Sequence, residues 1–518
     1  MAVCDFRFHS YFSIINTSVT APESRAKHNP FDEDQHSSHA YNSVSSSDIT
    51  YSASTGRVTF GVAGTYLIVF SVALTLDTGE NTTIATIEIN GSAQYTSAPF
   101  LGNTTYDPLD QTFHLITTVN AGDYLEVSVD SQNSSKITAQ NGTSLTVLKA
   151  NGDYGYLMYT SDASASGGNT EIALFDSNER TADTQTLKNV DYDATYGILT
   201  PDNTRKFLML STLIGTHSAN SGEINHSFFV NGNEIETLPV NMPRNADPLE
   251  MSIGLLKSLT ADETCSARAQ STVTAGGGGT ITANKGTAFS IFDITNNGTD
   301  PTAFLSLSVD ADSSAASGGG DLTCFDEDGW ASYASTSFVT ATGITYTASD
   351  GTFVVGAAGK YFILWNLVIG TATATGARTV EIKNGTTVVY QAPWHIHTNT
   401  DPIEKTVCVI LDASAGDSFT FIITAPNGKV DAGTAITMFK VDDGRYAETL
   451  YSESTPIAQI SDDFTLNNYA IDNLSAQYKK VPKQVPFILG TPGPLSLRGR
   501  CFATTETPPN VSTGDKKN

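Results

Sequence analysis

The stretch from Asp107 to Val129, DPLDQTFHLITTVNAGDYLEVSV, has a layout that recurs in the chain and decides the fold. It begins with Asp-Pro, continues as an alternating apolar run, turns at a short acidic segment and ends in a second alternating run. The layout returns in DPLEMSIGLLKSLTADETCSA from Asp247 and in DPIEKTVCVILDASAGDSFTFII from Asp401. Proline fixes its own φ and keeps the preceding residue extended, so Asp-Pro ends a loop and starts a strand. The pattern predicts one β-module that occurs three times.

Four further motifs accompany this layout, in the same order in each copy. Phe-Asp stands first, at Phe31, Phe175 and Phe325. A Tyr-containing segment follows as ITYSASTG, VDYDATYG and ITYTASDG, and then an Asn-Gly pair at Asn90, Asn231 and Asn384. Each copy closes on Gly-Thr and an apolar run, at Gly142, Gly286 and Gly433. Asn-Gly is a strong hairpin signal because both residues tolerate positive φ, and the fixed order predicts tandem repeats of about 150 residues.

The apolar pattern is that of an all-β protein. The runs GTYLIVFSVAL and GKYFILWNLVI place Tyr66 and Phe70 in one copy, and Tyr361 and Trp365 in another, on one face of a strand. The opposite face is also apolar, which is typical of a central strand that is covered on both sides. No window shows the spacing of an amphipathic helix. We therefore predict short strands in sandwiches of the jelly-roll type, with these four aromatic residues in the core.

We expect three tandem jelly rolls and a C-terminal arm. The predicted boundaries are 1–152, 153–298 and 299–443 for the jelly rolls, and 444–518 for a partial repeat followed by an extended Pro-rich basic tail. The second copy is degenerate, because TPDNTRKF stands where the other copies have GVAGTY and GAAGKY, and a run of glycines is inserted from Gly276. We expect this copy to keep the fold with altered loops.

Composition and charge exclude several function classes. The 518 residues are 39% hydrophobic and 16% charged, with a formal net charge of −26, and an acidic body of this kind repels nucleic acid. The five cysteines contain no CxxC pair, which gives no support to a structural zinc or thioredoxin-like site. The N-terminal residues have neither the basic start nor the apolar run of a signal peptide, and no apolar run reaches the ~18 residues of a membrane span. We therefore expect no nucleic-acid and no membrane partner.

The C-terminal tail differs from the rest of the chain. Residues 479–518 contain seven Lys or Arg and two acidic residues, so the tail carries +5 and the remaining chain −31. Six prolines between Pro482 and Pro509 hold such a segment extended and lower the entropy that it loses on docking. The predicted partner-binding residues are Lys479, Lys480, Lys483, Phe487, Ile488, Arg498 and Arg500. A flexible tail that is basic by chance is the alternative.

The succession of motifs resembles the C1q/TNF-like jelly roll. The first copy carries it as Phe31-Asp32, YSASTGRVTFGVAGTYLIVF, Asn90-Gly91, Gly122-Asp123 and GTSLTVL. The third copy has YTASDGTFVVGAAGKYFILW, Asn384-Gly385, Gly416-Asp417 and GTAITMF, and the second matches in part. The resemblance implies a ten-stranded two-sheet sandwich that assembles as compact trimers and binds other macromolecules rather than catalysing reactions. Two arrangements remain open: chains can align into stacked trimers, or the three copies of one chain can form a pseudo-trimer.

Histidines supply the first candidates for a metal site. His395 and His397 in WHIH lie on one strand face, but a transition-metal site needs three or four ligands, so a polar loop contact is the favoured interpretation. Residues 28–39 are rich in His, Asp and Glu at irregular spacing, and a solvated loop is favoured there.

Acidic turns and aromatic residues supply the other candidates. The segments Asn120–Asp123, Thr260–Glu263 and Ala415–Asp417 are predicted hairpin turns. Asp123 and Asp417 are candidates for a Ca2+ site, and an Asx interaction that stabilises the turn is the favoured alternative. Three aromatic residues near loops are candidates for glycan binding, with packing as their commoner role: Tyr106, Tyr333 and Trp394.

The chemistry favours binding over catalysis. No GxSxG, P-loop, HExxH or EF-hand motif is present, so we expect no catalytic residue and no cofactor. The favoured function is a structural protein of a virion surface, a bacteriophage capsid-decorating or fibre-like protein, whose partners are itself and other virion proteins. Microbial and viral relatives of the fold serve as spikes, fibres and capsid-surface proteins. The alternative is an adhesin or glycan-binding protein on a cell surface or appendage, with host-surface glycans as partners.

Overall fold

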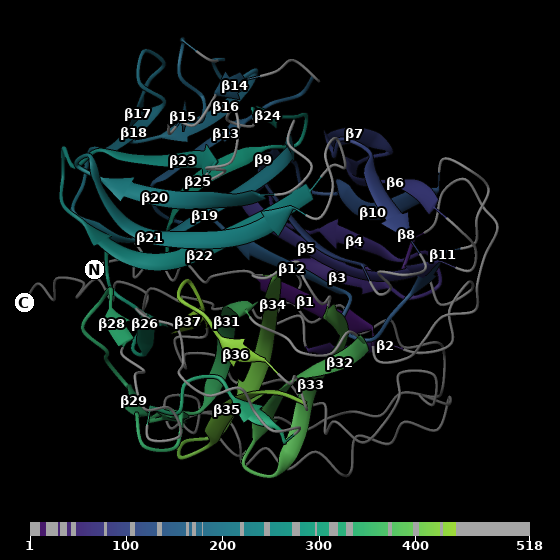
Figure 1. The fold of residues 1–518 in the computed structure, drawn as a ribbon, viewed down its shortest axis with the longest axis vertical. Coiled ribbons are helices and arrows are strands. Elements are labelled where there is room, and N and C mark those ends of the chain that lie inside the picture. Colours follow the sequence, from purple (N-terminus) through teal and green to yellow (C-terminus); the bar gives the residue numbers. More distant parts are fainter. Residues whose placement is uncertain are drawn as a thin grey trace, which may run out of the picture. The chain divides into compact units, whose positions relative to one another are not determined.

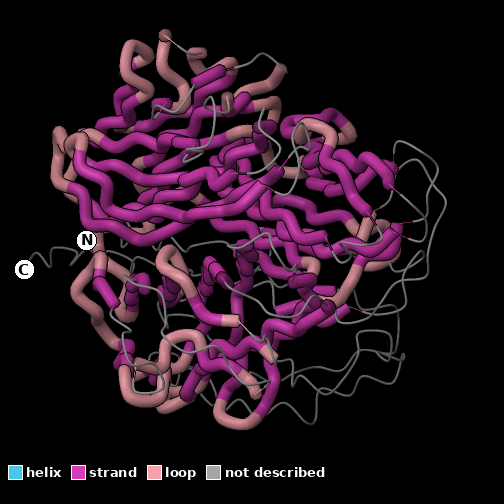
Figure 2. The backbone as a smooth tube through the Cα atoms, viewed as in Figure 1, coloured by secondary structure: helices cyan, strands magenta, loops and turns pink. Residues whose placement is uncertain are grey.

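The structure, a computed structural model, describes most of the chain up to Val441. The described residues are 11–16, 29–31, 39–42, 48–76, 80–103, 109–131, 137–161, 165–167, 172–178, 180–217, 222–242, 249–271, 280–295, 298–309, 320–327, 335–370, 376–396, 403–424 and 428–441. All of them lie in one compact unit, Met1–Tyr446. Their regular structure is entirely β-strand, drawn in magenta in Figure 2. This part of the chain therefore contains no helix that could cross a membrane.

The first jelly roll contains strands β1 to β12, coloured purple to blue in Figure 1. One sheet has the order β11-β5-β12-β1-β2 with β9 paired to β5, and the other has the order β3-β4-β10-β6-β7 with β8 paired to β6. The strands are β1 (Tyr11–Asn16), β2 (His39–Asn42), β3 (Ile49–Ser52), β4 (Arg57–Phe60), β5 (Gly64–Leu76), β6 (Glu80–Ile89), β7 (Ser92–Thr96), β8 (Phe100–Asn103), β9 (Leu109–Val119), β10 (Tyr124–Ser131), β11 (Ile137–Ala139) and β12 (Ser144–Lys149).

The second jelly roll contains strands β13 to β25 and has a similar topology, with β14 as an additional strand. Its sheets have the orders β14-β24-β19-β25-β13-β16, with β22 paired to β19, and β17-β18-β23-β20-β21, with β15 paired to β23. The strands are β13 (Tyr154–Met158), β14 (Ala165–Gly167), β15 (Ile172–Ala173), β16 (Thr184–Lys188), β17 (Val190–Asp193), β18 (Ile198–Pro201), β19 (Arg205–His217), β20 (Gly222–Val230), β21 (Asn233–Met242), β22 (Leu249–Leu259), β23 (Cys265–Ser271), β24 (Ile281–Ala283) and β25 (Ala288–Asp293).

The third jelly roll contains strands β26 to β37. Its sheets have the orders β28-β26-β37-β31-β34, with β36 paired to β31, and β29-β30-β35-β32-β33, with β27 paired to β35. The strands are β26 (Phe304–Val309), β27 (Leu322–Thr323), β28 (Ser335–Ser337), β29 (Ile344–Thr347), β30 (Thr352–Val355), β31 (Gly359–Gly370), β32 (Gly376–Asn384), β33 (Thr387–Ile396), β34 (Ile403–Ala413), β35 (Ser418–Ile423), β36 (Lys429–Val430) and β37 (Ala435–Lys440). The predicted fold class is confirmed, and the boundary residues between the jelly rolls stay predictions.

Each jelly roll has a central strand and an edge strand at equivalent positions. The central strands are β5, β19 and β31, each of which pairs with strands on both sides. The edge strands are β9, β22 and β34, which pair antiparallel with the central strands along their whole length. The Asp-Pro motif of the sequence stands just before each edge strand, as expected for a residue pair that starts a strand.

The Phe-Asp and Tyr motifs of the repeat are joined by one hydrogen bond in each jelly roll. The tyrosine hydroxyl donates to the backbone carbonyl of the phenylalanine, in Tyr51–Phe31 at 2.5 Å, Tyr192–Phe175 at 2.5 Å and Tyr346–Phe325 at 2.7 Å. The phenylalanine side chain is buried in every case. The two motifs therefore recur together because, in each jelly roll, the tyrosine holds the Phe-Asp segment against the sandwich.

The Asn-Gly motifs form the hairpins predicted for them. They join β6 to β7, β20 to β21 and β32 to β33, and each of these strand pairs is antiparallel. Asn90 and Asn231 have φ of 53° and 52°, and the glycines that follow are also at positive φ. Positive φ at both residues is the requirement of a type I′ turn, which asparagine and glycine meet with little strain. In the third copy Asn384 ends β32, and Gly385 has the positive φ.

The acidic segments form turns, but the prediction that these turns join hairpins is wrong. The backbone N–H of Asp123 donates to the Asn120 carbonyl at 3.1 Å, and Glu263 and Asp417 make the same bond in their copies. The flanking strands do not pair with each other, because β9 pairs with β5 while β10 pairs with β4 and β6 in the opposite sheet. The turn carries the chain from one sheet of the sandwich to the other. A turn between sheets and a hairpin turn within one sheet use the same residue types, so the sequence alone does not distinguish them.

The predicted core residues are buried. Tyr66, Phe70, Tyr361 and Trp365 have no exposed surface, and Trp365 packs edge-on against Phe421 at a ring-centroid distance of 5.3 Å. The hydroxyls of both tyrosines donate to backbone carbonyls four residues earlier in the sequence. The second jelly roll has Phe207 at this position, which is the packing counterpart without the hydroxyl.

Candidate functional site

Each central strand has a second buried face that lies outside its own sandwich. The side chains on this face belong to one continuous apolar cluster that includes residues of all three jelly rolls. Its members from the central and edge strands include Leu67, Val69, Ile116, Leu208, Leu210, Leu256, Phe362, Leu364, Cys408 and Ile410. The three jelly rolls therefore pack against one another through these faces, and we call this contact the three-way interface.

A ring of hydroxyl groups crosses the three-way interface. Thr112, Ser252 and Thr406 occupy equivalent positions, five residues after the Asp of each Asp-Pro pair. The Ser252 hydroxyl donates to the Thr112 carbonyl at 2.8 Å, and the Thr406 hydroxyl donates to the Ser252 carbonyl at 2.9 Å. The Thr112 hydroxyl completes the ring with the Thr406 carbonyl at 3.3 Å. We call these residues the hydroxyl ring.

The Gly-Thr motifs lie at the rim of the same interface. The Tyr95 hydroxyl of the first jelly roll donates to the Gly286 carbonyl of the second at 2.9 Å, and Tyr390 of the third donates to Gly142 of the first at 3.0 Å. Gly433 of the third meets the second, because a Cβ there would lie 2.5 Å from the Thr237 carbonyl oxygen. These glycines have positive φ and leave no room for a side chain, so the motif is a requirement of the contact between jelly rolls.

Both sets of contacts are cyclic. Each jelly roll contacts the next in the same sense, and the third returns to the first. Such a head-to-tail contact that closes after three steps is the interface of a cyclic trimer. Here all three partners belong to one chain, so the contacts are those of the pseudo-trimer, one of the two arrangements that the sequence left open.

The next layer of the interface uses a different residue in each copy. His114, Gly254 and Cys408 are equivalent, two residues beyond the hydroxyl ring. The His114 Nδ1 atom lies 3.1 Å from the Thr212 hydroxyl of the second jelly roll, and burial lowers the pKa of His114 to about 3, which keeps the imidazole neutral. A Cβ at Gly254 would lie 2.3 Å from Leu364 of the third jelly roll. At this level each copy therefore has a different side chain that fits the neighbouring copy it contacts.

Three acids, of which Glu250 is buried and the other two are partly buried, form the layer on the other side of the hydroxyl ring. Asp110, Glu250 and Glu404 are equivalent, three residues after the Asp of each Asp-Pro pair, and we call them the carboxyl layer. Lys405 forms an ion pair with Asp110, and the two side chains are 3% and 10% exposed. Burial raises the pKa of all three acids, that of Glu404 to about 8. The buried Lys405 therefore lies beside Asp110 and Glu404 of this layer.

The turn carboxylates proposed for calcium are engaged within their turns. Asp123 accepts hydrogen bonds from the Asn90 side chain at 2.7 Å and from the Asn120 backbone N–H at 2.6 Å. The Asn120 backbone bond, with the Asn90 amide, lowers the pKa of Asp123. Asp417 accepts the equivalent bonds from Asn384 and Ser414. Both carboxylates thus connect the Asn-Gly hairpin to the acidic turn, and within the described residues no group of three or more His, Cys, Asp or Glu is placed to hold a metal ion.

The other candidates from the sequence lie largely outside the described residues. The structure describes the backbone of His395 in β33 but not its side chain. His397 lies outside the described residues. Tyr106 and Tyr333 are outside as well, whereas Trp394 is buried in the core of the third jelly roll. The seven predicted tail residues also lie outside: Lys479, Lys480, Lys483, Phe487, Ile488, Arg498 and Arg500.

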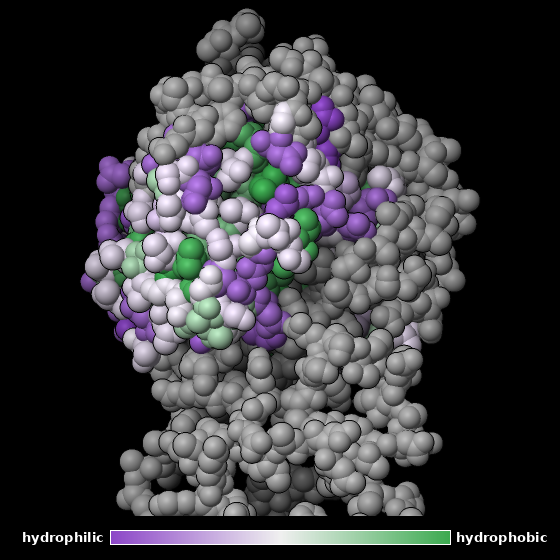
Figure 3. Space-filling model, turned by 90° about the horizontal axis from the view of Figure 1, so that it is seen from below, coloured by the Kyte–Doolittle hydropathy of each residue, from purple (hydrophilic) through white to green (hydrophobic). Residues whose placement is uncertain are grey.

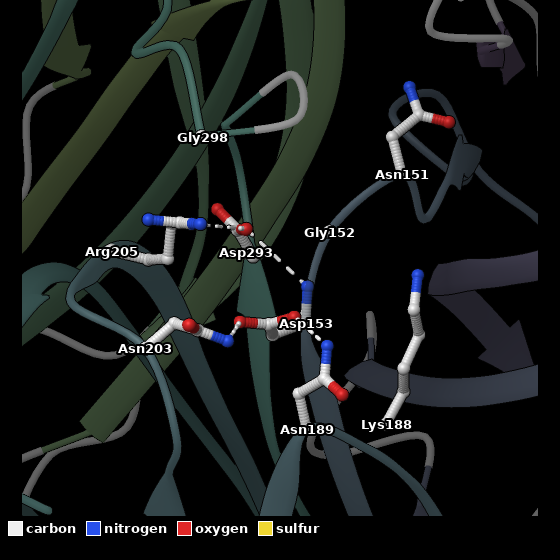
Figure 4. Close-up of a pocket in the computed structure, with 9 residues that line it drawn as sticks. All are labelled: Asn151, Gly152, Asp153, Lys188, Asn189, Asn203, Arg205, Asp293 and Gly298. Carbon is white, nitrogen blue, oxygen red and sulfur yellow. Dashed lines mark hydrogen bonds and ion pairs between the residues drawn. The ribbon is translucent and has the colours of Figure 1, made fainter. Parts of the chain in front are cut away.

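The degenerate second copy contains a polar pocket of about 270 Å³ (Figure 4). The Asp153 carboxylate accepts hydrogen bonds from Asn189 at 2.7 Å and Asn203 at 2.9 Å. The Arg205 Nε atom lies 3.7 Å from the buried carboxylate of Asp293. Asn203 and Arg205 belong to TPDNTRKF, the segment that departs from the repeat, so the departure supplies the lining of this pocket.

The described surface is mainly polar. Figure 3 shows hydrophilic residues interleaved with small, separate hydrophobic patches on one face of the molecule. Two large hydrophobic side chains of the described residues are exposed, Tyr196 at 60% and Val388 at 42%. The large apolar faces of the strands are thus used in the sandwich cores and the three-way interface.

Comparison with known proteins gives structural neighbours only. No family model matches the sequence, and no curated protein matches it. Among solved structures, murine APRIL is 15% identical, covers 27% of this chain and 98% of its own, and has a TM-score of 0.20. Eiger TNF from S. frugiperda is 13% identical, covers 28% of this chain and 96% of its own, and has a TM-score of 0.21. The jelly-roll assignment rests on the strand pairing described above.

The sequence contains a signal for the carboxyl layer that composition alone does not reveal. The three copies read DPLD, DPLE and DPIE, so an acid stands at the same place in each edge strand. An acid that recurs on an otherwise apolar strand face indicates a shared buried environment. The hydroxyl ring has a parallel signal in Thr112, Ser252 and Thr406, which alternate with the large apolar residues of the sandwich core.

Proposed function

We propose that this chain is a structural protein of a virion surface, a bacteriophage capsid-decorating or fibre-like protein that acts by binding rather than catalysis. The observation that carries the proposal is the three-way interface, which joins three jelly rolls of one chain in a closed ring. A protein of this design presents a trimer-like unit without an assembly step between chains. Such a unit suits a position where one molecule must attach intact and stay folded outside a cell.

The charge distribution supports attachment through the tail. The chain carries −26 in total while residues 479–518 carry +5. A basic, Pro-rich arm with apolar anchors at Phe487 and Ile488 fits an acidic neighbouring surface, where charge steers the encounter and apolar contacts hold it. We therefore propose other virion proteins as partners of the tail and the virion surface as the location.

The test is the composition of purified particles. Particles from a culture that produces the full chain are purified on a density gradient, and the chain is quantified by mass spectrometry against the major coat protein. The proposal expects a fixed ratio in wild-type particles and loss of the chain from particles when residues 479–518 are deleted. Native mass and circular dichroism of the deletion variant check that its jelly rolls are still folded. A chain that is absent from all particles would overturn the proposal.

A second candidate function, glycan binding by an adhesin, is favoured by the polar pocket of the second jelly roll. Asn189, Asn203 and Arg205 present amide and guanidinium groups around buried carboxylates, which are groups that hydrogen-bond sugar hydroxyls. Binding of the full chain to a glycan array, compared between Asn203→Ala and the exposed control Asn233→Ala, tests this function. Specific binding that Asn203→Ala alone abolishes would favour the adhesin over the virion protein.

A further inference from the structure

The carboxyl layer brings one acid from each jelly roll into a shared buried place. The Glu250 carboxyl lies within hydrogen-bond distance of the Ser252 hydroxyl, and the Thr406 hydroxyl lies 3.3 Å from Glu404. Lys405 pairs with one oxygen of Asp110, and the other oxygen of that carboxylate is buried without a hydrogen-bond partner. The layer therefore has one unsatisfied oxygen, at Asp110, whereas Glu250 and Glu404 also accept backbone hydrogen bonds from Thr112 and Ser252 of the neighbouring jelly rolls.

The charges around the layer do not balance. The edge strands contribute Asp110, Glu250, Glu404 and Lys405, which sum to −2 when all are ionised. The neighbouring strands β7 and β33 contribute Tyr95 and Tyr390, and burial raises the pKa of both phenols well above the usual range. Deeper in the interface, His114 and the Cys408 thiol are neutral, because burial lowers the pKa of the first and raises that of the second. Lys405 is thus the one cation that faces the layer from the described residues.

We propose that the carboxyl layer makes the three-way interface pH-dependent, so that the contact is tightest in acid and loosens as the pH rises past neutrality. A carboxyl group that is largely removed from water is more stable in its neutral form, because ionisation then places a charge where little water can solvate it. Each acid belongs to a different jelly roll, so repulsion among ionised groups acts directly on the contact between them. The hydroxyl ring is two residues away on the same strands, and it is the first structure that the loosening reaches.

The sign of the effect follows from the direction of the pKa shifts. Burial raises the pKa of Glu404 from 4.5 to about 8, and burial together with the nearby Glu404 carboxylate raises the pKa of Glu250 well above its usual range. A group whose folded pKa is raised contributes stability that is fully present below its unfolded pKa and is lost as the pH rises through the folded value. For Glu404 this window runs from about 4.5 to about 8. Exposed carboxylates that are hydrogen-bonded in their charged form, such as Asp123, act in the opposite sense.

The experiment compares two isosteric variants of the full chain. Unfolding by denaturant is followed by tryptophan fluorescence from pH 5 to pH 9 for wild type, Glu404→Gln and the control Glu234→Gln, which removes an exposed acid on β21. Relative to Glu404→Gln, the unfolding constant of wild type is expected to rise by up to about tenfold per pH unit inside the window. Glu234→Gln should follow wild type. Parallel profiles of wild type and Glu404→Gln would overturn the proposal.

A second variant tests the same proposal from the side of the cation. Lys405→Met removes the cation that holds down the folded pKa of Asp110 and Glu404, so the loss of stability should become larger and extend to higher pH. Amide hydrogen exchange of wild type in β9, β22 and β34 gives a readout that needs no variant. Once intrinsic rates are corrected, protection in these strands should fall from pH 6 to pH 8, and unchanged protection would contradict the proposal.

Discussion

On β5, Tyr66 and Phe70 face the core of their own sandwich, whereas Leu67 and Val69 on the opposite face pack towards the other jelly rolls. On β5 the sandwich face has large aromatic side chains, and the interface face has smaller aliphatic side chains. The faces of β31 also divide between two clusters, with Tyr361 and Trp365 in one and Leu364 in the other, although the aromatic Phe362 lies on its interface face. One strand therefore stabilises both the single jelly roll and the union of three.

The comparison also separates the kinds of sequence change that each face tolerates. The sandwich faces keep an aromatic ring at one position in all copies, in Tyr66, Phe207 and Tyr361, although the second copy has Ser211 where the others have Phe70 and Trp365. The interface faces have diverged, as His114, Gly254 and Cys408 show, because each copy meets a different neighbour. Repeats that pack against one another within a chain are free to become complementary pairs, whereas identical subunits of a homotrimer are not.

The largest expected effect comes from a truncation on the sandwich face. Phe70→Ala leaves a cavity between Phe31 and Phe113, whose ring centroids lie 6.3 and 6.4 Å from that of Phe70, and should cost about 3–5 kcal/mol in the free energy of unfolding. All three tryptophans lie between residues 330 and 394, so tryptophan fluorescence reports on the third copy.

The denaturant concentration of this tryptophan transition tests whether the first and third jelly rolls unfold together. Because the first and third jelly rolls share the three-way interface, Phe70→Ala should also move the tryptophan transition to lower denaturant. Circular dichroism of the whole chain provides the reference transition. A tryptophan transition that stays unchanged while circular dichroism shifts would mean that the jelly rolls unfold independently.

A smaller effect is expected at the rim of the interface. In Gly142→Ala the new Cβ would lie 2.3 Å from the Ala392 Cβ of the third jelly roll, and such overpacking costs about 1–3 kcal/mol. Gly122→Ala is the matched control, since Gly122 has φ of 93°, similar to the 81° of Gly142, and nothing within 4 Å of the added carbon. The difference in denaturation midpoint between the two variants isolates the contact between jelly rolls, and equal midpoints would show that Gly142 does not meet Ala392.

The smallest effect concerns a single hydroxyl group. Tyr390→Phe removes the bond to the Gly142 carbonyl and should cost about 0.5–1.5 kcal/mol. Tyr361→Phe removes a bond to Ala357 inside the third jelly roll and serves as the control. Hydrogen exchange should accelerate in β12 of the first jelly roll for Tyr390→Phe and stay unchanged there for Tyr361→Phe. Faster exchange in both variants would mean that the effect is not transmitted through the interface.

Much of the fold was predictable because its determinants are local. Asn-Gly, Asp-Pro and the alternating apolar runs each act over a few residues, and they gave the hairpins, the edge strands and the core aromatics. The acidic turns were misassigned because a turn within a sheet and a turn between sheets use the same residues. The second apolar face of the central strands indicated that this face is buried, but it did not indicate by which partner. A neighbouring copy in the same chain and a second chain would bury it equally well.

The mass of the purified full chain in solution tests the central claim most directly. If the three-way interface is closed within one chain, native mass spectrometry and sedimentation should find a folded species of 54.9 kDa that persists on dilution. The buried interface needs no second copy, so dilution should leave its hydrogen exchange unchanged. A species of three times that mass, with no folded single chain at any concentration, would contradict the account and favour a homotrimer.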